Sequence, residues 1–406
     1  MNDIFIIGLG YVGLPLAVIA AKNGYKVTGF DIDESKVSCL RNGISNLSSF
    51  TNDELIYLQN NGNLSFVNSL PKLSTPAIFV IAVPTPLDEK RNPDMSYLRG
   101  ACMKISEVIS DGSIVITEST SYVGTLMEFI KPLIERFSKS RGIHFAVAPE
   151  RIDPGNDTWN ISNTPRVIGG NTIQATKLAA DFYSIFCSDI VQVSSPEVAE
   201  MAKLLENTFR QVNIALINEI AALAKSVNIS MHEVISAAAS KPFGFMEFRP
   251  SIGVGGHCIP IDPVYLCYSG DKNNIKLELV KLANYKNYNQ VNYVLRSIKT
   301  YMEGNLSGKI IQLVGISYKR NIADTRESPA IKLMYELRNL GANVIWHDPI
   351  VKKFKDEKSN NLQREIDLGI ILTPHDDINF DVWSDIKHKL IDFSSGKKIL
   401  GLSKFF

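Results

Sequence analysis

The feature that most constrains the fold is a glycine pattern near the start of the chain, Gly8-Leu-Gly-Tyr-Val-Gly13. An apolar, strand-like run at residues 3–7 precedes it, and an apolar helical stretch at residues 14–23 follows it. A second strand-like run, residues 25–30, ends at Asp31, 18 residues beyond the last glycine. Gly-x-Gly-x-x-Gly between a strand and a helix, followed by such an acid, is typical of a dinucleotide-binding βαβ unit.

This pattern predicts the cofactor as well as the fold. The glycines would admit a pyrophosphate to the helix N-terminus, where unpaired N–H groups and the helix dipole favour anions. Asp31 would accept hydrogen bonds from the adenosine ribose and would repel a 2′-phosphate, so NAD is favoured over NADP. The candidate cofactor-binding residues here are Gly8, Gly10, Tyr11, Val12, Gly13, Asp31 and Lys36.

Further alternation of strands and helices follows in the first half of the chain. Strands are predicted at residues 77–83, 113–118 and 144–148, with helices starting at Ser96 and Gly124. Such alternation predicts a parallel, doubly wound sheet, whose strand carboxyl ends line the cofactor crevice. Candidate site segments are therefore Pro84-Thr85-Pro86, Glu118-Ser119-Thr120 and Pro149-Glu150-Arg151, although each could also be an ordinary turn.

The remaining chain predicts a long helix and a second α/β domain. A helical pattern runs without a breaker from Ser195 to about Ser226, about 45 Å at 1.5 Å per residue. Shorter helices are expected at residues 231–239 and 275–303. Strands at 309–316, 343–347, 368–372 and 389–393, with a helix at 329–340, then form a second β–α series.

At about 150 residues per domain, 406 residues suggest two or three domains. We predict an α/β fold: two Rossmann-like doubly wound domains joined by a long central helix. The expected divisions are 1–194 for the NAD-binding domain, 195–304 for a central helical domain, and 305–406 for the C-terminal domain.

A cysteine loop, Gly253-Val-Gly-Gly-His-Cys-Ile-Pro-Ile-Asp262, lies in the central region. Its glycines allow positive φ or close approach of the backbone to a neighbour. Pro260 and Pro263 are expected to keep the exit from the loop out of a helix or a central strand. A presented thiol at Cys258, with a carboxylate four residues on, suggests a nucleophile with a partner that handles water or a proton. The alternative is a tight turn in which a small thiol fills a gap.

Two further groups of polar residues suggest a cleft. Lys203, Asn207 and Arg210 fall at i, i+4 and i+7 of the long helix, so they form one polar line among apolar neighbours, although an exposed lysine on a solvated face is common. In the second β–α series, the first strand is followed by Lys319 and Arg326, a basic pair that suits a phosphorylated ligand. Two such domains imply a binding cleft between them.

Composition narrows the class of protein. A net charge of +1 gives no footprint for nucleic acid or a membrane surface. The five cysteines are scattered without a Cys-x-x-Cys pair, and the six histidines show no ligand spacing, so we expect no metal and a reducing cytosol. The uncharged stretch at residues 4–21 is interpreted as a buried strand and helix and not as a membrane span, because it holds three glycines and Pro15.

Taken together, the motifs resemble the UDP-glucose/GDP-mannose dehydrogenase family over nearly the whole chain, in order. They are Gly8-Leu-Gly-Tyr-Val-Gly13-Leu-Pro-Leu-Ala17, Val83-Pro-Thr-Pro86, Glu118-Ser-Thr120, Pro149-Glu-Arg151, Lys203-Leu-Leu-Glu-Asn207, Gly255-Gly-His-Cys258-Ile-Pro-Ile-Asp262 and Tyr318-Lys319 to Asp324-Thr-Arg326-Glu-Ser-Pro329.

The resemblance implies oxidation of a nucleotide sugar at C6, from alcohol to carboxylate, with two NAD. Cys258 would add to the C6 aldehyde, the resulting thiohemiacetal would be oxidised to a thioester, and water handled by Asp262 would hydrolyse it. Lys203 would stabilise the oxyanion with help from Asn207. Thr120 and Glu150 match positions that the family uses around the reacting carbon and a catalytic water.

Other residues would bind the two ligands. Pro84, Thr85, Thr120 and Arg326 are expected on the cofactor side. The candidate substrate-binding residues are Glu150, Arg151, Lys203, Asn207, Arg210, Arg249, Gly255 and Lys319.

The sugar is predicted by comparing this sequence with the motifs that distinguish the branches of the family. Enzymes for UDP-glucose carry Pro-Glu-Phe-Leu-Arg-Glu, whereas this chain has Pro149-Glu-Arg-Ile-Asp-Pro154, with Pro154 in place of the second glutamate. This form is similar to the UDP-N-acetylhexosamine branch, and Lys241-Pro-Phe-Gly-Phe-Met246 with Phe248-Arg249-Pro250 favours UDP-N-acetylglucosamine. UDP-N-acetylmannosamine and UDP-glucose are the alternatives.

Two other classes of function are considered. One is a two-electron hydroxy-acid dehydrogenase, which needs no cysteine, and the other is a non-enzymatic NAD-binding or redox-sensing protein. For the preferred function we expect a cytoplasmic homodimer formed through the long helix and the region up to the cysteine loop. The resemblance also implies a role in making precursors of capsule or surface polysaccharide.

Overall fold

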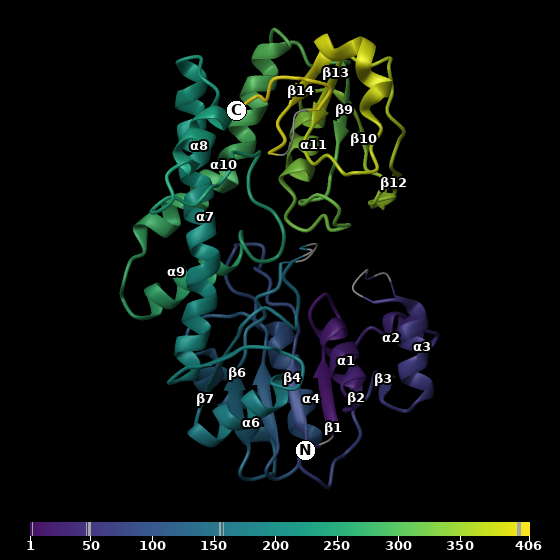
Figure 1. The fold of residues 1–406 in the computed structure, drawn as a ribbon, viewed down its shortest axis with the longest axis vertical. Coiled ribbons are helices and arrows are strands. Elements are labelled where there is room, and N and C mark those ends of the chain that lie inside the picture. Colours follow the sequence, from purple (N-terminus) through teal and green to yellow (C-terminus); the bar gives the residue numbers. More distant parts are fainter. Residues whose placement is uncertain (2, 46, 48–49, 154–155, 157, 396–398) are drawn as a thin grey trace. The chain divides into compact units, whose positions relative to one another are not determined.

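The structure is a computed structural model of the chain. It describes all residues except 2, 46, 48–49, 154–155, 157 and 396–398. The chain forms two compact units, each with its own sheet (Figure 1). The first consists of Met1–Leu205 with Asp271–Asn273, and the second of Glu206–Gly270 with Asn274–Phe406.

The first unit contains an eight-stranded sheet in the order β3-β2-β1-β4-β5-β6-β7-β8. Its strands are β1 (Asp3–Ile7), β2 (Lys26–Phe30), β3 (Leu64–Val67), β4 (Ile78–Ile81), β5 (Ile114–Thr117), β6 (His144–Val147), β7 (Arg166–Gly170) and β8 (Ile190–Gln192). Neighbouring strands pair in parallel from β3 to β6, whereas β6 and β7 run antiparallel. The five predicted strands, β1, β2, β4, β5 and β6, are therefore correctly placed in a parallel arrangement, whereas β3, β7 and β8 were not predicted.

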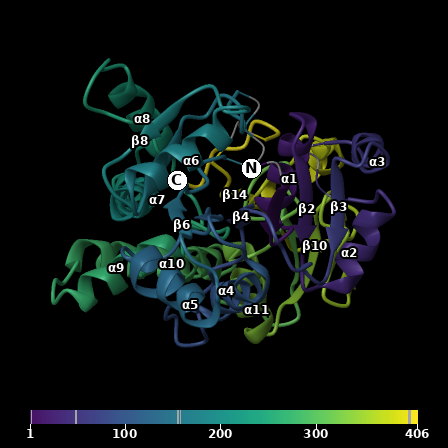
Figure 2. The same cartoon turned by 90° about the horizontal axis from the view of Figure 1, so that it is seen from below.

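Helices cover both faces of this sheet. They are α1 (Gly13–Lys22), α2 (Glu34–Arg41), α3 (Asn52–Asn60), α4 (Ser96–Val108), the π-helical turn η1 (Leu126–Ile130), α5 (Lys131–Phe137) and α6 (Ile173–Tyr183). Side chains alternate along β1, so Ile4 and Ile6 join the core shared with α1 and α6, while Phe5 and Ile7 join the core shared with α4 and α5. Burial on both faces explains why these strands are continuously apolar. At the outer edge, α2 and α3 lie beside β3 in both views (Figures 1 and 2).

The long helix predicted from the sequence is present as α7 (Pro196–Ser226), 31 residues, followed by α8 (Met231–Ala239). The division between the compact units falls within α7, after Leu205. The three-domain division at 194 and 304 therefore stays a prediction. Among the described helices, none combines the length and the apolar character needed to cross a bilayer.

The second unit contains a four-stranded parallel sheet in the order β10-β9-β13-β14. Its strands are β9 (Ile310–Val314), β10 (Asn343–His347), β13 (Leu368–Ile371) and β14 (Leu390–Asp392), with a small hairpin of β11 (Lys353–Phe354) and β12 (Glu357–Lys358). The helices are α9 (Asp262–Lys272), α10 (Glu278–Tyr301), α11 (Pro329–Asn339) and the 3-10 segment η2 (Phe380–Lys389). The predicted second β–α series is confirmed.

The prediction that the prolines would keep the exit of the cysteine loop out of a helix is wrong. Helix α9 begins at Asp262, and Pro263 is its second residue. Proline is tolerated there because the N–H groups of the first helical turn have no intrahelical acceptor. The cysteine loop thus leads directly into a helix N-terminus.

Candidate active site

The glycine motif forms the turn between β1 and α1. Gly8 has φ +97°, and a Cβ there would lie 2.7 Å from the carbonyl oxygen of Ala82. A Cβ on Gly13 would overlap the carbonyl of Gly8. The turn therefore requires glycine at both positions, and this close approach of backbone to backbone leaves the helix N-terminus open to a pyrophosphate.

Asp31 and Lys36 lie beside this turn. Oδ2 of Asp31 accepts a hydrogen bond from the Leu9 N–H at 2.9 Å and forms an ion pair with the Lys36 ammonium at 2.8 Å. Its Oδ1 accepts one bond from the Asp33 N–H at 3.0 Å. Because each carboxylate oxygen can accept more than one hydrogen bond, Oδ1 can still accept a ribose hydroxyl, so these residues fit NAD.

The loops after β4 and β5 are joined at the carboxyl edge of the sheet. The Thr85 hydroxyl donates to the Thr120 carbonyl at 2.6 Å, and the Ser119 hydroxyl donates to the Val83 carbonyl at 2.7 Å. Since β4 is the neighbour of β1, the predicted segments around Pro84, Thr85 and Thr120 lie on the same edge as the glycine turn.

Glu150 follows β6 and is held by three donors. Its Oε1 accepts from the N–H groups of Arg151 and Ile152 at 2.6 and 2.7 Å, and its Oε2 pairs with Arg166 at 2.9 Å. Arg151 itself donates to the Pro165 carbonyl at 2.7 Å. Pro154, on which the comparison with the UDP-glucose enzymes depends, is not among the residues that the structure describes.

Sequence reasoning missed Arg166, the first residue of β7, which is buried and also pairs with Glu118 at 3.2 Å. Tyr183 on α6 donates its hydroxyl to the same Glu118 carboxylate at 2.5 Å. Burial raises the pKa of Glu118 to about 7, against the opposing effect of Arg166. No local motif marks Arg166, because its partners come from three separate segments.

The polar line on α7 is only partly as predicted. Lys203 and Asn207 are 8% and 6% exposed, whereas Arg210 is exposed to solvent. The first two therefore match a buried polar line, and Arg210 does not. Lys203 belongs to the first compact unit and Asn207 to the second.

In the second unit, the cysteine loop is anchored at its C-terminal end, Asp262. The Asn207 amide donates to Asp262 at 2.6 Å, and both side chains are buried. The Asp262 N–H donates to the Cys258 carbonyl at 2.8 Å, so the loop continues directly into α9. Cys258 is partly exposed, whereas Cys102, Cys187 and Cys267 are buried.

The glycines of this loop behave as predicted. Gly253 and Gly256 have φ +132° and +83°, and a Cβ on Gly255 would lie 2.7 Å from the Cβ of Tyr318. The Gly256 N–H donates to the Arg326 carbonyl at 2.9 Å. The loop is thus packed against the segment that follows β9.

Arg326 lies in the second unit, beside the cysteine loop. Its guanidinium contacts His257 Nδ1 at 3.1 Å and pairs with Asp324 at 2.6 Å, which lowers the pKa of that carboxyl despite its burial. The predicted role of Arg326 on the cofactor side stays a prediction. Arg249 pairs with Glu247 and contacts His232 Nδ1 at 2.9 Å.

Lys319 is partly buried. The loop that carries it is bonded to a pair of residues that sequence reasoning missed, His375 and Asp348. His375 Nδ1 accepts from the Asn321 N–H at 2.9 Å, and its Nε2 lies 3.1 Å from the carboxylate of Asp348. Because Nδ1 accepts, the ring carries its proton on Nε2 and donates it to Asp348. Both residues follow strands, β13 and β10, and a polar residue at a strand end is the signal that could have found them.

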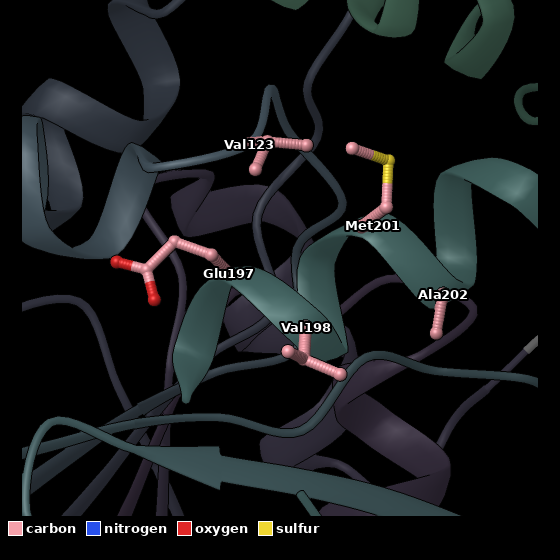
Figure 3. A pocket seen from close by; sticks show the side chains of 5 residues that line it. All are labelled: Val123, Glu197, Val198, Met201 and Ala202. Atoms are coloured by element: carbon pink, nitrogen blue, oxygen red, sulfur yellow. The ribbon is translucent and has the colours of Figure 1, made fainter. Parts of the chain in front are cut away.

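A shallow depression of about 430 Å³ lies on the first turns of α7, lined by Val123, Glu197, Val198, Met201 and Ala202 (Figure 3). Its lining is almost wholly apolar and offers no cation for a phosphate. In the part of the chain that the structure describes, no group of three or more His, Cys, Asp or Glu could hold a metal ion.

Next to this depression, Glu200 of α7 accepts from the N–H groups of Gly124 and Leu126 at 2.6 and 2.9 Å. Burial raises its pKa from 4.5 to about 7. A folded-state pKa raised in this way means that folding takes up a proton between these values, so the contribution of Glu200 to stability is fully present below pH 4.5 and is lost as pH rises towards 7. This contribution of Glu200 to the free energy of unfolding is about 3 kcal/mol, at about 1.36 kcal/mol per pKa unit.

We therefore expect Glu200→Gln to remove part of the fall in unfolding free energy between pH 4.5 and pH 7. Denaturant unfolding of wild type and variant across this range measures the difference. Glu135→Gln, which removes an exposed glutamate from α5, should leave the slope unchanged. Parallel pH curves for wild type and Glu200→Gln would contradict the expectation.

Comparison with known proteins identifies the family. Residues 2–187 match the NAD binding domain of the UDP-glucose/GDP-mannose dehydrogenase family, residues 197–289 its central domain, and residues 312–399 its UDP binding domain.

The chain is similar to named relatives over most of its length. It is 36% identical to the UDP-N-acetyl-D-glucosamine 6-dehydrogenase of Pseudomonas aeruginosa, covering 85% of this chain and 82% of the relative. It is 34% identical to the UDP-N-acetyl-D-mannosamine dehydrogenase of Pyrococcus horikoshii, covering 96% and 94%. The solved structure of a UDP-D-ManNAc dehydrogenase from Pyrococcus horikoshii matches with a TM-score of 0.88 and 31% identity over 100% of this chain and 97% of that one.

These matches set aside the hydroxy-acid dehydrogenase and the non-enzymatic NAD-binding protein. The predicted fold class and cofactor are confirmed. The chain belongs to the UDP-glucose/GDP-mannose dehydrogenase family and is an NAD-dependent nucleotide-sugar dehydrogenase.

Proposed function

We propose that the enzyme oxidises a UDP-N-acetylhexosamine, with UDP-N-acetylglucosamine the preferred substrate, at C6 to the uronic acid through a covalent intermediate on Cys258. The observation that carries the proposal is the partly exposed Cys258 thiol, presented by a glycine loop beside the buried Asn207–Asp262 pair. NAD, when bound, accepts one hydride in each of two oxidations.

The residues of the loop have coherent roles in this proposal. The carbonyl of Cys258 accepts a backbone hydrogen bond from the first residue of α9, so the thiol stands near a helix N-terminus, where a thiolate is stabilised. Its sulfur adds to the C6 aldehyde carbon, and the aldehyde oxygen takes a proton to give a thiohemiacetal. Loss of hydride and of the hydroxyl proton gives a thioester. Water then hydrolyses it, releasing the carboxylic acid and restoring the thiol.

Asp262 and Asn207 act together in the hydrolytic step. With Asn207 fixing one carboxylate oxygen at 2.6 Å, the Asp262 carboxylate keeps a single orientation in which it can receive a proton from water. Lys203 precedes Asn207 by one turn of α7, and its ammonium stabilises the oxyanion at C6. Thr120 and Glu150, from the carboxyl edge of the first sheet, serve the reacting carbon and the catalytic water.

Binding of the two ligands is assigned on the same basis. Lys319 is proposed to bind the substrate, and Gly255, which lets the cysteine loop pack closely against Tyr318, to bind it through its backbone. Arg151, Arg210 and Arg249 are proposed to contact the acetamido or diphosphate groups. Arg326, which contacts His257 in the cysteine loop, is proposed to bind the cofactor.

The choice of sugar can be tested directly. Relatives named for UDP-N-acetylglucosamine and for UDP-N-acetylmannosamine are similarly close, so the sequence motifs alone favour the first. The experiment incubates the enzyme and NAD with UDP-glucose, UDP-N-acetylglucosamine, UDP-N-acetylgalactosamine and UDP-N-acetylmannosamine, and counts NADH per sugar consumed. We expect two NADH per UDP-N-acetylglucosamine and a much lower kcat/KM for the others. A preference for another sugar would overturn the assignment of substrate, and one NADH per sugar would overturn the four-electron reaction.

We also propose a cytoplasmic homodimer that supplies precursors of surface polysaccharide. Phe209, Leu216 and Leu223 recur every seven residues on α7, and the last two are 51% and 63% exposed. An apolar seam with this repeat suits packing against a second copy of the same helix.

Light scattering tests the homodimer. We expect about 90 kDa for wild type, twice the 45.1 kDa of the chain. The double variant Leu216→Lys with Leu223→Lys should shift the mass to that of the monomer, and the exposed Ile173→Lys should not. A monomeric mass for wild type would refute the homodimer.

A further inference from the structure

The first unit contains a buried ionic network in which only Glu150 has a role in the proposed mechanism. Arg166 lies at the start of β7, and its guanidinium reaches two carboxylates, those of Glu150 at 2.9 Å and Glu118 at 3.2 Å. The same group donates to the carbonyls of Ala148 and Pro149 at 3.3 and 3.4 Å. One side chain thus ties together the exits of β5 and β6.

The network is asymmetric in its access to solvent. The side chains of Glu118 and Arg166 are 0% and 3% exposed, whereas that of Glu150 is 12% exposed. Tyr183, which is fully buried, donates to Glu118, and its ring lies 4.8 Å from the guanidinium of Arg166. Of these four groups, Glu150 is therefore the one that a ligand or a reacting water can reach.

The bonds around Glu150 fix its direction. Two backbone N–H groups hold Oε1 and Arg166 holds Oε2, so rotation of the carboxylate would break at least one of them. A buried arginine can hold a carboxylate in one place only if its own position is fixed. It also needs carboxylate partners, because an unpaired buried cation is strongly disfavoured. Glu118 and the ring of Tyr183 supply that fixation from the side away from solvent.

We propose that Arg166 is a positioning residue for the reaction: it fixes the carboxylate of Glu150 at the carboxyl edge of the sheet, with Glu118 and Tyr183 as its buried supports. This inference rests on the proposed role of Glu150 at the catalytic water. Arginine is required because a planar guanidinium can bridge two carboxylates, whereas the ammonium of lysine is a single point charge.

The test is a double-mutant cycle between Arg166→Lys and Glu150→Gln, read as kcat and KM for NAD and for the UDP-sugar. Arg166→Lys keeps the charge but cannot span both carboxylates, so we expect kcat to fall about 10- to 100-fold, the range for a catalytic group displaced by about 1 Å. Both KM values should change less than about threefold, since the contacts to the ligands remain.

The cycle separates positioning from a purely structural role. If Arg166 acts through Glu150, Arg166→Lys should have almost no further effect on kcat in the Glu150→Gln background. Multiplicative effects of the two substitutions would overturn the proposal, as would a wild-type kcat in Arg166→Lys with only lowered stability. Should Arg166→Lys not fold, Glu118→Gln carries the same test, because its effect on kcat must also vanish when Glu150 is already glutamine.

This experiment is independent of the covalent mechanism. NADH release measures the cycle whether or not Cys258 forms a thioester. Formation of the uronic acid by Cys258→Ala at the wild-type rate would overturn the proposed function and leave the Arg166 result interpretable, and a multiplicative cycle would overturn the Arg166 inference alone.

Discussion

Cys258→Ala is expected to abolish formation of the uronic acid, with a loss of about a thousandfold or more. A nucleophile that forms a covalent intermediate is worth at least this much, because the alternative route has no activated group to replace it. Without the thiol, the C6 aldehyde cannot become a thiohemiacetal, so the second hydride transfer and the thioester hydrolysis are both lost. Mass spectrometry of the product and the yield of NADH per sugar measure the effect.

Two other cysteines provide controls for this prediction. Cys39→Ala removes an exposed thiol from α2, and Cys267→Ala removes a buried thiol from α9, nine residues after Cys258. Both variants should retain two NADH per sugar, although Cys267→Ala should be less stable because it leaves a small cavity. Acid production by Cys258→Ala at the wild-type rate would show that the cysteine is not the nucleophile. Membership of the family would stand unchanged.

The parts of the fold with strong periodicity could be predicted from the sequence. The βαβ unit around Gly8, the long α7, and strands β10 and β13 lie within a few residues of the predicted bounds. Their signal is local, since a buried parallel strand is a short apolar run and an amphipathic helix repeats every three to four residues. The conformation of the glycines in the cysteine loop was also predictable, because glycine is the residue that best tolerates positive φ and close packing of the backbone.

The rest depends on partners that the sequence does not place together. The support of Glu150 by Arg166 joins residues 16 positions apart, and the bond from Tyr183 to Glu118 spans 65 positions. Asp262 was predicted to handle water. Its hydrogen bond with Asn207, 55 residues earlier in the chain, follows only from the fold. The start of α9 at Asp262 was missed because Pro263 stops a helix in its interior and is accepted in its first turn.

The packing of the cysteine loop leads to the second large expected effect, that of Gly256→Ala. Gly256 has φ +83°, and a Cβ there would lie 2.8 Å from the ring of Tyr318. We expect the free energy of unfolding to fall by about 3 kcal/mol, of which about 1 to 2 kcal/mol is the cost of positive φ for alanine. Since the loop must shift to relieve the contact, and Cys258 is two residues away, kcat should fall about 100-fold.

Gly304→Ala is the matched control for this variant. Gly304 has φ +82°, nearly the same conformation, but no atom lies within 4 Å of the position of its Cβ. It should therefore lose only the backbone term, about 1 to 2 kcal/mol, and keep the wild-type kcat. Chemical denaturation and steady-state kinetics of the two variants separate backbone strain from displacement of the loop. Equal losses of stability and equal kcat in both variants would mean that Tyr318 does not hold the cysteine loop in place. In that case the position of the Cys258 thiol would have to be set by the Asn207–Asp262 pair and α9 alone.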